Sequence, residues 1–334
     1  MRTGVSYDPR MASYSCLWDE TYVENPERYL CVVRRCRELG LLDNCVKVES
    51  RMATREEMLM CHDEKLLETL ESTVDMNVEE LKDVSSRYDC LYMHQNSWAA
   101  AKLSAGGAID MVTAVVDGEV DTGFAIVRPP GHHAMRADSC GYCYLNNVAL
   151  ATRAALNKGV ERVLIVDWDV HHGQGTQREF YSDSRVLYIS IHRFESGGWW
   201  PNLAESDYGS VGEGAGAGYN INIPLNTTGN TDSDYLAAWH GVVLPAAAEY
   251  SPQLVIISAG YDPAIGCPEG EQEVSPACFA HFTHSLQGNK IVQHHHLMCS
   301  YSSSWGVCMC CARGRILPTI PGRGSCPHTE VIIG

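Results

Sequence analysis

The sequence predicts an α/β fold in which a largely parallel central sheet is covered by helices on both faces. Three short segments are almost entirely apolar, as expected for strands buried on both sides: GFAIV (123–127), VLIV (163–166) and LVIISAG (254–260). Helical patterns lie between these segments, and such alternation of strand and helix is typical of parallel sheets. A chain of 334 residues can form one domain of this class.

The remaining elements can be placed in chain order. Asn25-Pro26 favours the start of a helix and Gly40 its end, because a capping residue before proline and a terminal glycine are typical of these positions. Thr54 and Glu57 have the spacing of a capping box, which predicts a second helix. We expect further helices at 97–116, 146–157, 232–250 and 275–286, and a further strand at 186–191.

The character of the sequence changes after Ile291-Val292. Residues 293–334 contain five of the 15 cysteines and show no sustained periodicity. They do not resemble the continuation of a core strand. We therefore expect one domain over residues 2–292, followed by an unrelated, disordered tail over residues 293–334.

Composition and charge limit the classes of function. A formal net charge of −16 argues against general nucleic-acid binding and is compatible with cationic substrates. No stretch approaches the roughly 20 consecutive apolar residues of a membrane helix, and the first residues, MRTGVSYDPR, lack the apolar segment of a secretory signal. The cysteines show no disulfide-scaffold spacing, which favours reduced thiols. We expect a cytoplasmic protein, with the nucleus as an alternative location.

Each of the three apolar strands is followed directly by polar residues. GFAIV precedes RPPGHH, VLIV precedes DWDVHH, and LVIISAG precedes YDP. Ligands bind beyond the carboxyl ends of parallel strands, so we expect a site at this edge of the sheet. Strand alternation places Asp167, Asp169 and His171 on one side and Trp168 on the other. Loop capping and core packing explain each polar residue alone, but they do not explain three such strand ends together.

Asp169, His171 and Asp262 form a candidate metal site. Carboxylates this close repel each other unless a cation lies between them. Two oxygens and one nitrogen suit a catalytic zinc with an open fourth position. His132 and His133 come within reach of such a metal. A metal-bound water beside a histidine base predicts hydrolysis of a carbonyl compound.

At these residues the sequence resembles the zinc-dependent histone deacetylase family. The segments RPPGHHA (128–134), GYCYLNNVA (141–149), VDWDVHHGQGTQ (166–177) and SAGYDP (258–263) match the family in order and spacing. The sequence is most similar to class IIb, which contains tubulin and acetylpolyamine deacetylases. The resemblance implies the three-layer arginase/deacetylase fold and a Zn²⁺ ion held by Asp169, His171 and Asp262.

The resemblance also implies roles for neighbouring residues. His132 and His133 would be the catalytic pair, with His133 the proton shuttle and Asp167 the partner of His132. Structural K⁺ ions would bind at two sites. The implied ligand positions are Asp167, Asp169, His171 and Ser190 for one site, and the region of Phe180, Val186 and Tyr219 for the other.

A substrate tunnel is implied by the same resemblance. Gly141, Tyr142 and Trp200 would line the path of an acetyl-lysine, although aromatic residues are also common in ordinary cores. Glu269 occupies the place of a glutamate that, in acetylpolyamine deacetylases, attracts the far end of a cationic substrate. The alternative for Glu269 is a solvated surface carboxylate. Cys90 lies at a rim position where the tubulin deacetylases have serine.

Two departures from the family concern the chemistry. Gln174 stands where class I enzymes have an aspartate, so one carboxylate that would favour protonated His133 is missing. Family members also carry a Gly-Gly-Tyr turn after a final strand, and no GGY occurs in this chain. The tyrosine stabilises an oxyanion by about 3 kcal/mol in comparable sites. Tyr301 lies near the expected distance but outside that motif, and we expect the final strand and helices to be missing.

The sequence thus predicts a zinc-dependent hydrolase that removes acetyl groups from lysine side chains of proteins such as tubulin or histone tails. RPPGHHA and DYLAAWH (234–240) favour the tubulin branch. Acetylpolyamine hydrolysis is the alternative that Glu269 supports. A catalytically impaired product that binds acetyl-lysine is the alternative that the missing GGY supports. Nucleic acids and membranes are not expected as partners.

Overall fold

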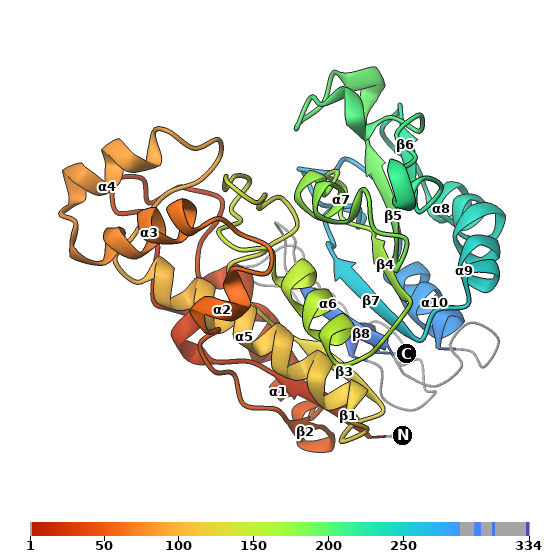
Figure 1. Cartoon of the computed structure of the whole chain (residues 1–334), viewed down its shortest axis with the longest axis horizontal. Helices are drawn as coiled ribbons and strands as arrows, with labels where there is room; N and C mark the ends of the chain where they lie inside the picture. Colours follow the sequence, from red (N-terminus) through yellow and green to blue (C-terminus); the bar gives the residue numbers. More distant parts are fainter. Residues whose placement is uncertain (1, 288–296, 302–308, 311–331, 334) are drawn as a thin grey trace.

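An eight-stranded sheet forms the centre of the protein, and all its strand pairs are parallel. The computed structural model describes residues 2–287, 297–301, 309–310 and 332–333. The strand order is β2-β1-β3-β8-β7-β4-β5-β6 (Figure 1). The strands are β1 Thr3–Ser6, β2 Val46–Lys47, β3 Thr122–Ala125, β4 Val163–Asp167, β5 Val186–Arg193, β6 Asn220–Leu225, β7 Leu254–Ala259 and β8 Leu297–Tyr301.

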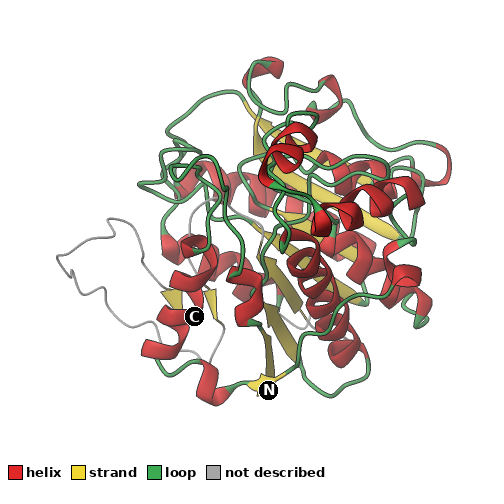
Figure 2. Ribbon diagram, turned by 90° about the vertical axis from the view of Figure 1, so that its left-hand side faces the viewer, coloured by secondary structure: helices red, strands yellow, loops and turns green. Residues whose placement is uncertain are grey.

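Helices cover both faces of this sheet, as Figures 1 and 2 show. α5 packs against α6 and against β1 and β3, and a continuous helical run from α8 to α9 lies near α10 on the other side (Figure 1). The α-helices are α1 Glu27–Glu38, α2 Arg55–Met58, α3 Glu64–Ser72, α4 Val78–Ser85, α5 Ser97–Val116, α6 Asn147–Asn157, α7 Gln174–Phe180, α8 Asp232–Ala238, α9 Leu244–Tyr250 and α10 Pro276–Leu286. The three-layer α/β architecture predicted from the sequence is confirmed.

Local sequence signals agree with the observed element boundaries. β4 and β7 are buried along their whole length, which explains their uninterrupted apolar character. Thr54 accepts a hydrogen bond from the backbone N–H of Glu57, and the Glu57 carboxylate accepts one from the N–H of Thr54, so the predicted capping box is present. The expected helix over 232–250 contains a π-helical segment, Trp239–Val243, between α8 and α9.

Helix α5 is more apolar than the sequence analysis allowed. By length and composition alone it could cross a membrane, with a mean hydropathy of 1.3. However, 72% of that window is buried inside the protein. A central core helix needs the same apolar composition, so α5 is explained by its packing against the sheet.

Strand β8 contradicts the expectation that the final strand is missing. It lies between β3 and β7, with Tyr301 opposite Ala259 and Ser300 opposite Ala125. The expected domain boundary at 292 and most of the expected tail over 293–334 fall outside the described residues. Two short segments of that region, β9 Met309–Cys310 and β10 Ile332–Ile333, form a separate parallel pair. The sequence prediction failed because LMCSY lacks the apolar character of the other central strands.

Candidate active site

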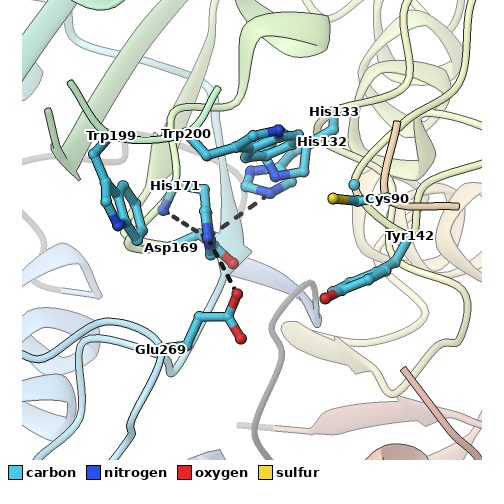
Figure 3. A pocket seen from close by; sticks show the side chains of 10 residues that line it. Cys90, His132, His133, Tyr142, Asp169, His171, Trp199, Trp200 and Glu269 are labelled. Carbon is cyan, nitrogen blue, oxygen red and sulfur yellow. Dashed lines mark hydrogen bonds and ion pairs between the residues drawn. The ribbon is translucent and has the colours of Figure 1, made fainter. Parts of the chain in front are cut away.

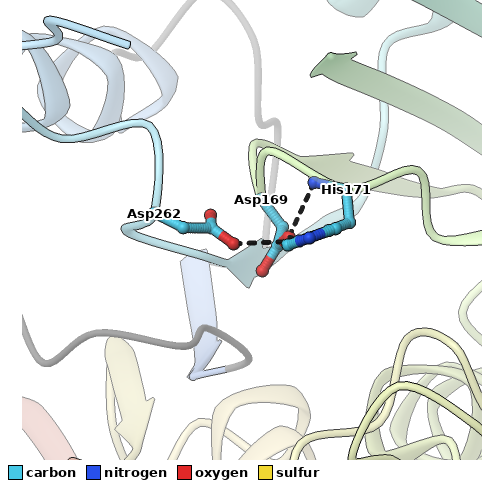
Figure 4. Close-up of side chains that lie close together, drawn as sticks. All are labelled: Asp169, His171 and Asp262. Carbon is cyan, nitrogen blue, oxygen red and sulfur yellow. Dashed lines mark hydrogen bonds and ion pairs between the residues drawn. The ribbon is translucent and has the colours of Figure 1, made fainter. Parts of the chain in front are cut away.

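The predicted metal ligands meet where two neighbouring strands end. β4 and β7 run side by side, and Asp169 and Asp262 follow their carboxyl ends. One ligand atom each from Asp169, His171 and Asp262 lies within 4.8 Å of the other two (Figure 4). Gly260 permits this approach, because a Cβ atom there would lie 2.1 Å from the Asp169 carboxylate.

The donor set fits a divalent cation. His171 Nδ1 lies 3.0 Å from Asp169 Oδ1 and 3.1 Å from Asp262 Oδ2, so all three side chains converge. The two carboxylates are 1% and 0% exposed. Burial and the neighbouring Asp262 carboxylate raise the pKa of Asp169, which shows how poorly two such anions tolerate each other. A cation between them would remove this conflict, and two oxygens with one imidazole nitrogen suit zinc.

Trp168 confirms the predicted alternation along this segment. Its side chain is fully buried on the opposite side, where it contacts Trp239, Tyr261, Phe279 and Phe282. This aromatic cluster holds the backbone in place between Asp167 and Asp169. The N–H groups of Val170 and His171 donate 2.8 Å hydrogen bonds to Asp262 and Asp169, respectively, and these bonds orient both carboxylates.

The two predicted catalytic histidines lie together, with ring centroids 3.9 Å apart. His132 Nδ1 lies 2.9 Å from Asp167 Oδ2, which also accepts a hydrogen bond from the Tyr188 hydroxyl. His133 Nδ1 lies 2.7 Å from Gln174 Oε1. An amide oxygen can only accept, so His133 carries its proton on Nδ1 and keeps a free lone pair on Nε2.

Their surroundings drive the two imidazoles apart in basicity. Burial lowers the pKa of His132, but the Asp167 and Asp169 carboxylates outweigh it, and the net pKa lies above the ordinary value. Burial, His132 and His171 hold the pKa of His133 well below its ordinary value. Such a divergence separates a cationic group from a neutral base. His133 is therefore the group able to accept a proton.

A closed ring of hydrogen bonds orients Gln174. Its amide nitrogen donates to Cys140 Sγ at 3.2 Å, and the Cys140 thiol donates to the backbone oxygen of His133 at 3.6 Å. Burial raises the pKa of Cys140 to about 12, so the thiol keeps the proton that it donates. The ring fixes which end of the Gln174 amide faces His133. Cys140 was not identified from the sequence, because no motif marks its role.

A cavity of about 280 Å³ opens onto His132 and His133 and onto two of the three predicted metal ligands, Asp169 and His171. In Figure 3, Trp199 and Trp200 lie on one side of it and Cys90 and Tyr142 on the other. Asp262 and Asp167 do not line the cavity: Asp262 lies behind it, beside His171, and Asp167 contacts His132. The lining residues are Cys90, His132, His133, Gly141, Tyr142, Asp169, His171, Trp199, Trp200 and Glu269.

Gly141 lines the cavity between the rings of His133 and Trp200. Its φ is +54°, and an added Cβ atom would lie 2.5 Å from the His133 ring and 2.6 Å from the Trp200 ring. The Trp200 ring contacts the His133 ring edge-on, with ring centroids 4.6 Å apart. Trp200 Nε1 donates a 2.7 Å hydrogen bond to Asp89 Oδ2. Only glycine fits here without moving the ring of His133 or Trp200.

Trp199 is a wall residue that the sequence analysis missed. It stacks on His171 with ring centroids 4.5 Å apart and an interplanar angle of 18°. The guanidinium carbon of Arg193 also lies over the Trp199 ring, 4.7 Å from the ring centroid. Opposite, Tyr142 packs against the Tyr22 ring and beneath Arg28, 5.2 Å from the ring centroid. The tandem Trp-Trp pair was the available signal.

Glu269 lies in the cavity rather than on open surface. Its Oε1 is 3.7 Å from His171 Nε2, and its side chain is 27% exposed. Arg193 Nη1 donates to the backbone oxygens of Glu269 and Gly270 at 3.5 and 3.3 Å, which holds this loop in place. The carboxylate therefore lies inside the cavity, beside His171.

The residues of the predicted potassium sites gather around β5. Ser190 lies opposite Asp167 in the pairing of β4 with β5. Val186 begins β5, Phe180 ends α7, and the backbone oxygen of Tyr219 accepts a hydrogen bond from the N–H of Tyr188. The potassium roles stay predictions.

Comparison with known proteins defines the class. The histone deacetylase domain matches residues 22–300 of this chain. The chain belongs to the histone deacetylase family.

Individual relatives agree. The polyamine deacetylase HDAC10 of Danio rerio is 50% identical over 283 residues, covering 84% of this chain and 42% of that protein. Human polyamine deacetylase HDAC10 is 44% identical over 290 residues, 86% and 43% of the two chains. The solved HDA15 HD domain is 35% identical with a TM-score of 0.82, covering 90% of this chain and 83% of that one. The chain spans less than half the length of the curated relatives named here.

Proposed function

We propose that this chain is a zinc-dependent deacetylase that hydrolyses the acetyl amides of cationic amines. The observation that carries the proposal is a cavity that reaches Asp169 and His171 of a cation-binding triad, beside two histidines whose pKa values are shifted in opposite directions. Its membership of the histone deacetylase family supports amide hydrolysis.

The chain's own residues divide the reaction between them. Asp169, His171 and Asp262 would hold Zn²⁺, which when bound polarises an acetyl carbonyl and lowers the pKa of water. His133 accepts a proton from the attacking water at Nε2 and then delivers one to the leaving amine. His132, kept cationic by Asp167, stabilises negative charge that develops beside it.

The preferred substrate class is an acetylpolyamine. Glu269 places a carboxylate inside the cavity, where a second ammonium group of the substrate would find it. The relatives named as polyamine deacetylases, 44–50% identical, support the same choice. The second candidate is acetyl-lysine in proteins such as tubulin or histone tails. A relative named histone deacetylase 6, from Caenorhabditis elegans, is 41% identical over 268 residues and supports that candidate.

A comparison of two substrates distinguishes these candidates. The kcat/KM for acetylspermidine should exceed that for an acetyl-lysine peptide, and Glu269→Leu should lower only the first, by about tenfold or more. Glu273→Leu is the matched control, since Glu273 is an exposed carboxylate four residues away that does not line the cavity. Equal losses on both substrates would reject a polyamine-specific role.

The missing GGY supports a second class of function, a product that binds acetylated amines without turning them over. Tyr301 is the last residue of β8 and pairs with Ala259 of β7. Ala259 lies three residues before the proposed ligand Asp262. Turnover by metal-loaded, folded protein, lost in Tyr301→Phe, would assign the oxyanion hydroxyl to Tyr301. Tight hydroxamate binding without any turnover would support the non-catalytic function.

Further parts of the proposal concern ions and location. We propose structural K⁺ beside Asp167 and Ser190 and near the start of β5. The ten cysteines of residues 2–287 are all free thiols. This supports a reducing compartment, the cytoplasm or the nucleus.

A further inference from the structure

Two exposed histidines from different helices face each other outside the catalytic cavity. His240 lies on the π-helical segment Trp239–Val243, and His281 lies on α10. Their Nε2 atoms are 3.0 Å apart, and their ring centroids 5.1 Å apart. Neither residue lines the catalytic cavity.

Buried contacts beneath the pair hold its two helices in register. Trp239, next to His240, stacks on Phe282, next to His281, with ring centroids 4.2 Å apart and an interplanar angle of 23°. Trp239 Nε1 also donates to Ser285 Oγ at 2.8 Å. Trp239 and Phe282 are both 0% exposed. The two imidazoles are therefore positioned by a rigid core rather than by flexible loops.

The π-helical turn adds a second reason to expect a role for this surface. π-helical turns are rare, and they occur frequently at functional sites. Here the turn presents His240 on the surface while Trp239 and Val243 stay buried. The irregular turn thus lies where the chain brings a second imidazole to α10.

The distance between the two nitrogens fits cis coordination of one metal ion. With metal–nitrogen bonds of about 2.05 Å, nitrogens 3.0 Å apart subtend an angle of roughly 94° at the metal. Such an angle suits octahedral or square-planar coordination, with water in the other positions. Burial, His240 and His284 lower the pKa of His281, which favours the neutral form of the imidazole that binds metals.

We propose that His240 and His281 form a surface binding site for a divalent first-row transition metal. His284 lies one turn further along α10, but the only described group of three or more metal-ligating side chains with mutually close ligand atoms is the active-site triad. The surface site is accordingly a two-histidine site. It is independent of the proposed deacetylase function, because it shares no residue with the catalytic cavity.

The test is titration of Ni²⁺ into the untagged, reduced, full chain after the active site has been loaded with zinc. Calorimetry should detect a Ni²⁺ site that His240→Gln and His281→Gln each weaken at least about tenfold, because two imidazoles on one ion act as a chelate. The Ni²⁺ affinity of the double variant should be no lower than that of either single variant. His284→Gln is the matched control and should bind Ni²⁺ as the wild type does.

Ni²⁺ should also raise the melting temperature of the wild type and of His284→Gln, but not that of the two pair variants. This second readout shows that the variants fold and that the metal joins two parts of the folded chain. Unchanged Ni²⁺ affinity in both pair variants would overturn the proposal. A loss in His284→Gln as large as in the pair variants would overturn it as well.

Discussion

Replacing Gly141 by alanine tests how closely the cavity wall fits the catalytic ring. The added Cβ atom would lie 2.5 Å from His133 Cδ2 and 2.6 Å from Trp200 Cη2. Ordinary carbon contacts are about 3.5–4.0 Å, so one of the rings has to move by roughly 1 Å. A 1 Å displacement of a catalytic group costs about 100-fold in rate. The variant should also lose stability: overpacking lowers the free energy of unfolding by about 1–3 kcal/mol, and alanine at positive φ lowers it by about 1–2 kcal/mol more.

The control for this variant is Gly118→Ala. Gly118 has a φ of +72°, but no atom lies within 4 Å of its added Cβ. It should therefore lose only the backbone contribution of about 1–2 kcal/mol and keep its activity. The assays are urea unfolding, kcat/KM with acetylspermidine, and hydroxamate affinity, which reports on the site even without turnover. A Gly141→Ala variant with wild-type kcat/KM and hydroxamate affinity would refute the close fit.

Two further predictions follow from buried polar pairs. Glu24 accepts hydrogen bonds of 2.6 and 2.8 Å from Arg128, and both side chains are 2% exposed. Because Glu24→Gln leaves the Arg128 charge buried without its partner, it should lower the free energy of unfolding by about 3–5 kcal/mol. Replacing the exposed Glu20 by glutamine is the control and should change the free energy of unfolding little. Burial raises the pKa of Glu24, but Arg128 and Arg28 outweigh it and the net pKa is lowered. The stability that ionised Glu24 contributes is therefore complete above the ordinary carboxyl pKa of about 4.3 and is lost as pH falls through the folded-state pKa. Urea unfolding at a series of pH values measures this loss. Gln174→Glu places a carboxylate beside His133, which should raise the low pKa of that base and move the acid limb of the kcat/KM profile up by roughly 1–3 pH units. An acid limb that stays in place would show that His133 is not the base.

The parts of the site predicted from the sequence are those encoded by local spacing. Asp169 and His171 share one side of an extended segment, and Asp262 follows a neighbouring strand, so their convergence needed only the strand pattern and the parallel sheet. The sheet edge and the histidine pair follow from the same reasoning. These predictions succeeded because short-range geometry decides them.

The parts that were not predicted depend on contacts between distant segments. The Gln174–Cys140 bond joins residues 34 positions apart, and the Arg128–Glu24 pair joins residues 104 apart. Neither has a periodicity or a motif that marks it. The stacking of Trp199 on His171 likewise joins residues that are 28 positions apart in the sequence. β8 was missed because tertiary pairing with β3 and β7, rather than composition, defines it.

The proposed function depends on one zinc ion held jointly by Asp169, His171 and Asp262. The direct measurement is the zinc content of purified chain by plasma mass spectrometry, made in a His240→Gln background so that the surface pair does not contribute. We expect one zinc per chain, falling to about a tenth or less in Asp262→Asn, while circular dichroism stays that of a folded protein. Folded protein that lacks zinc, or an Asp262→Asn variant that retains it in full, would show that these three residues do not form the zinc site.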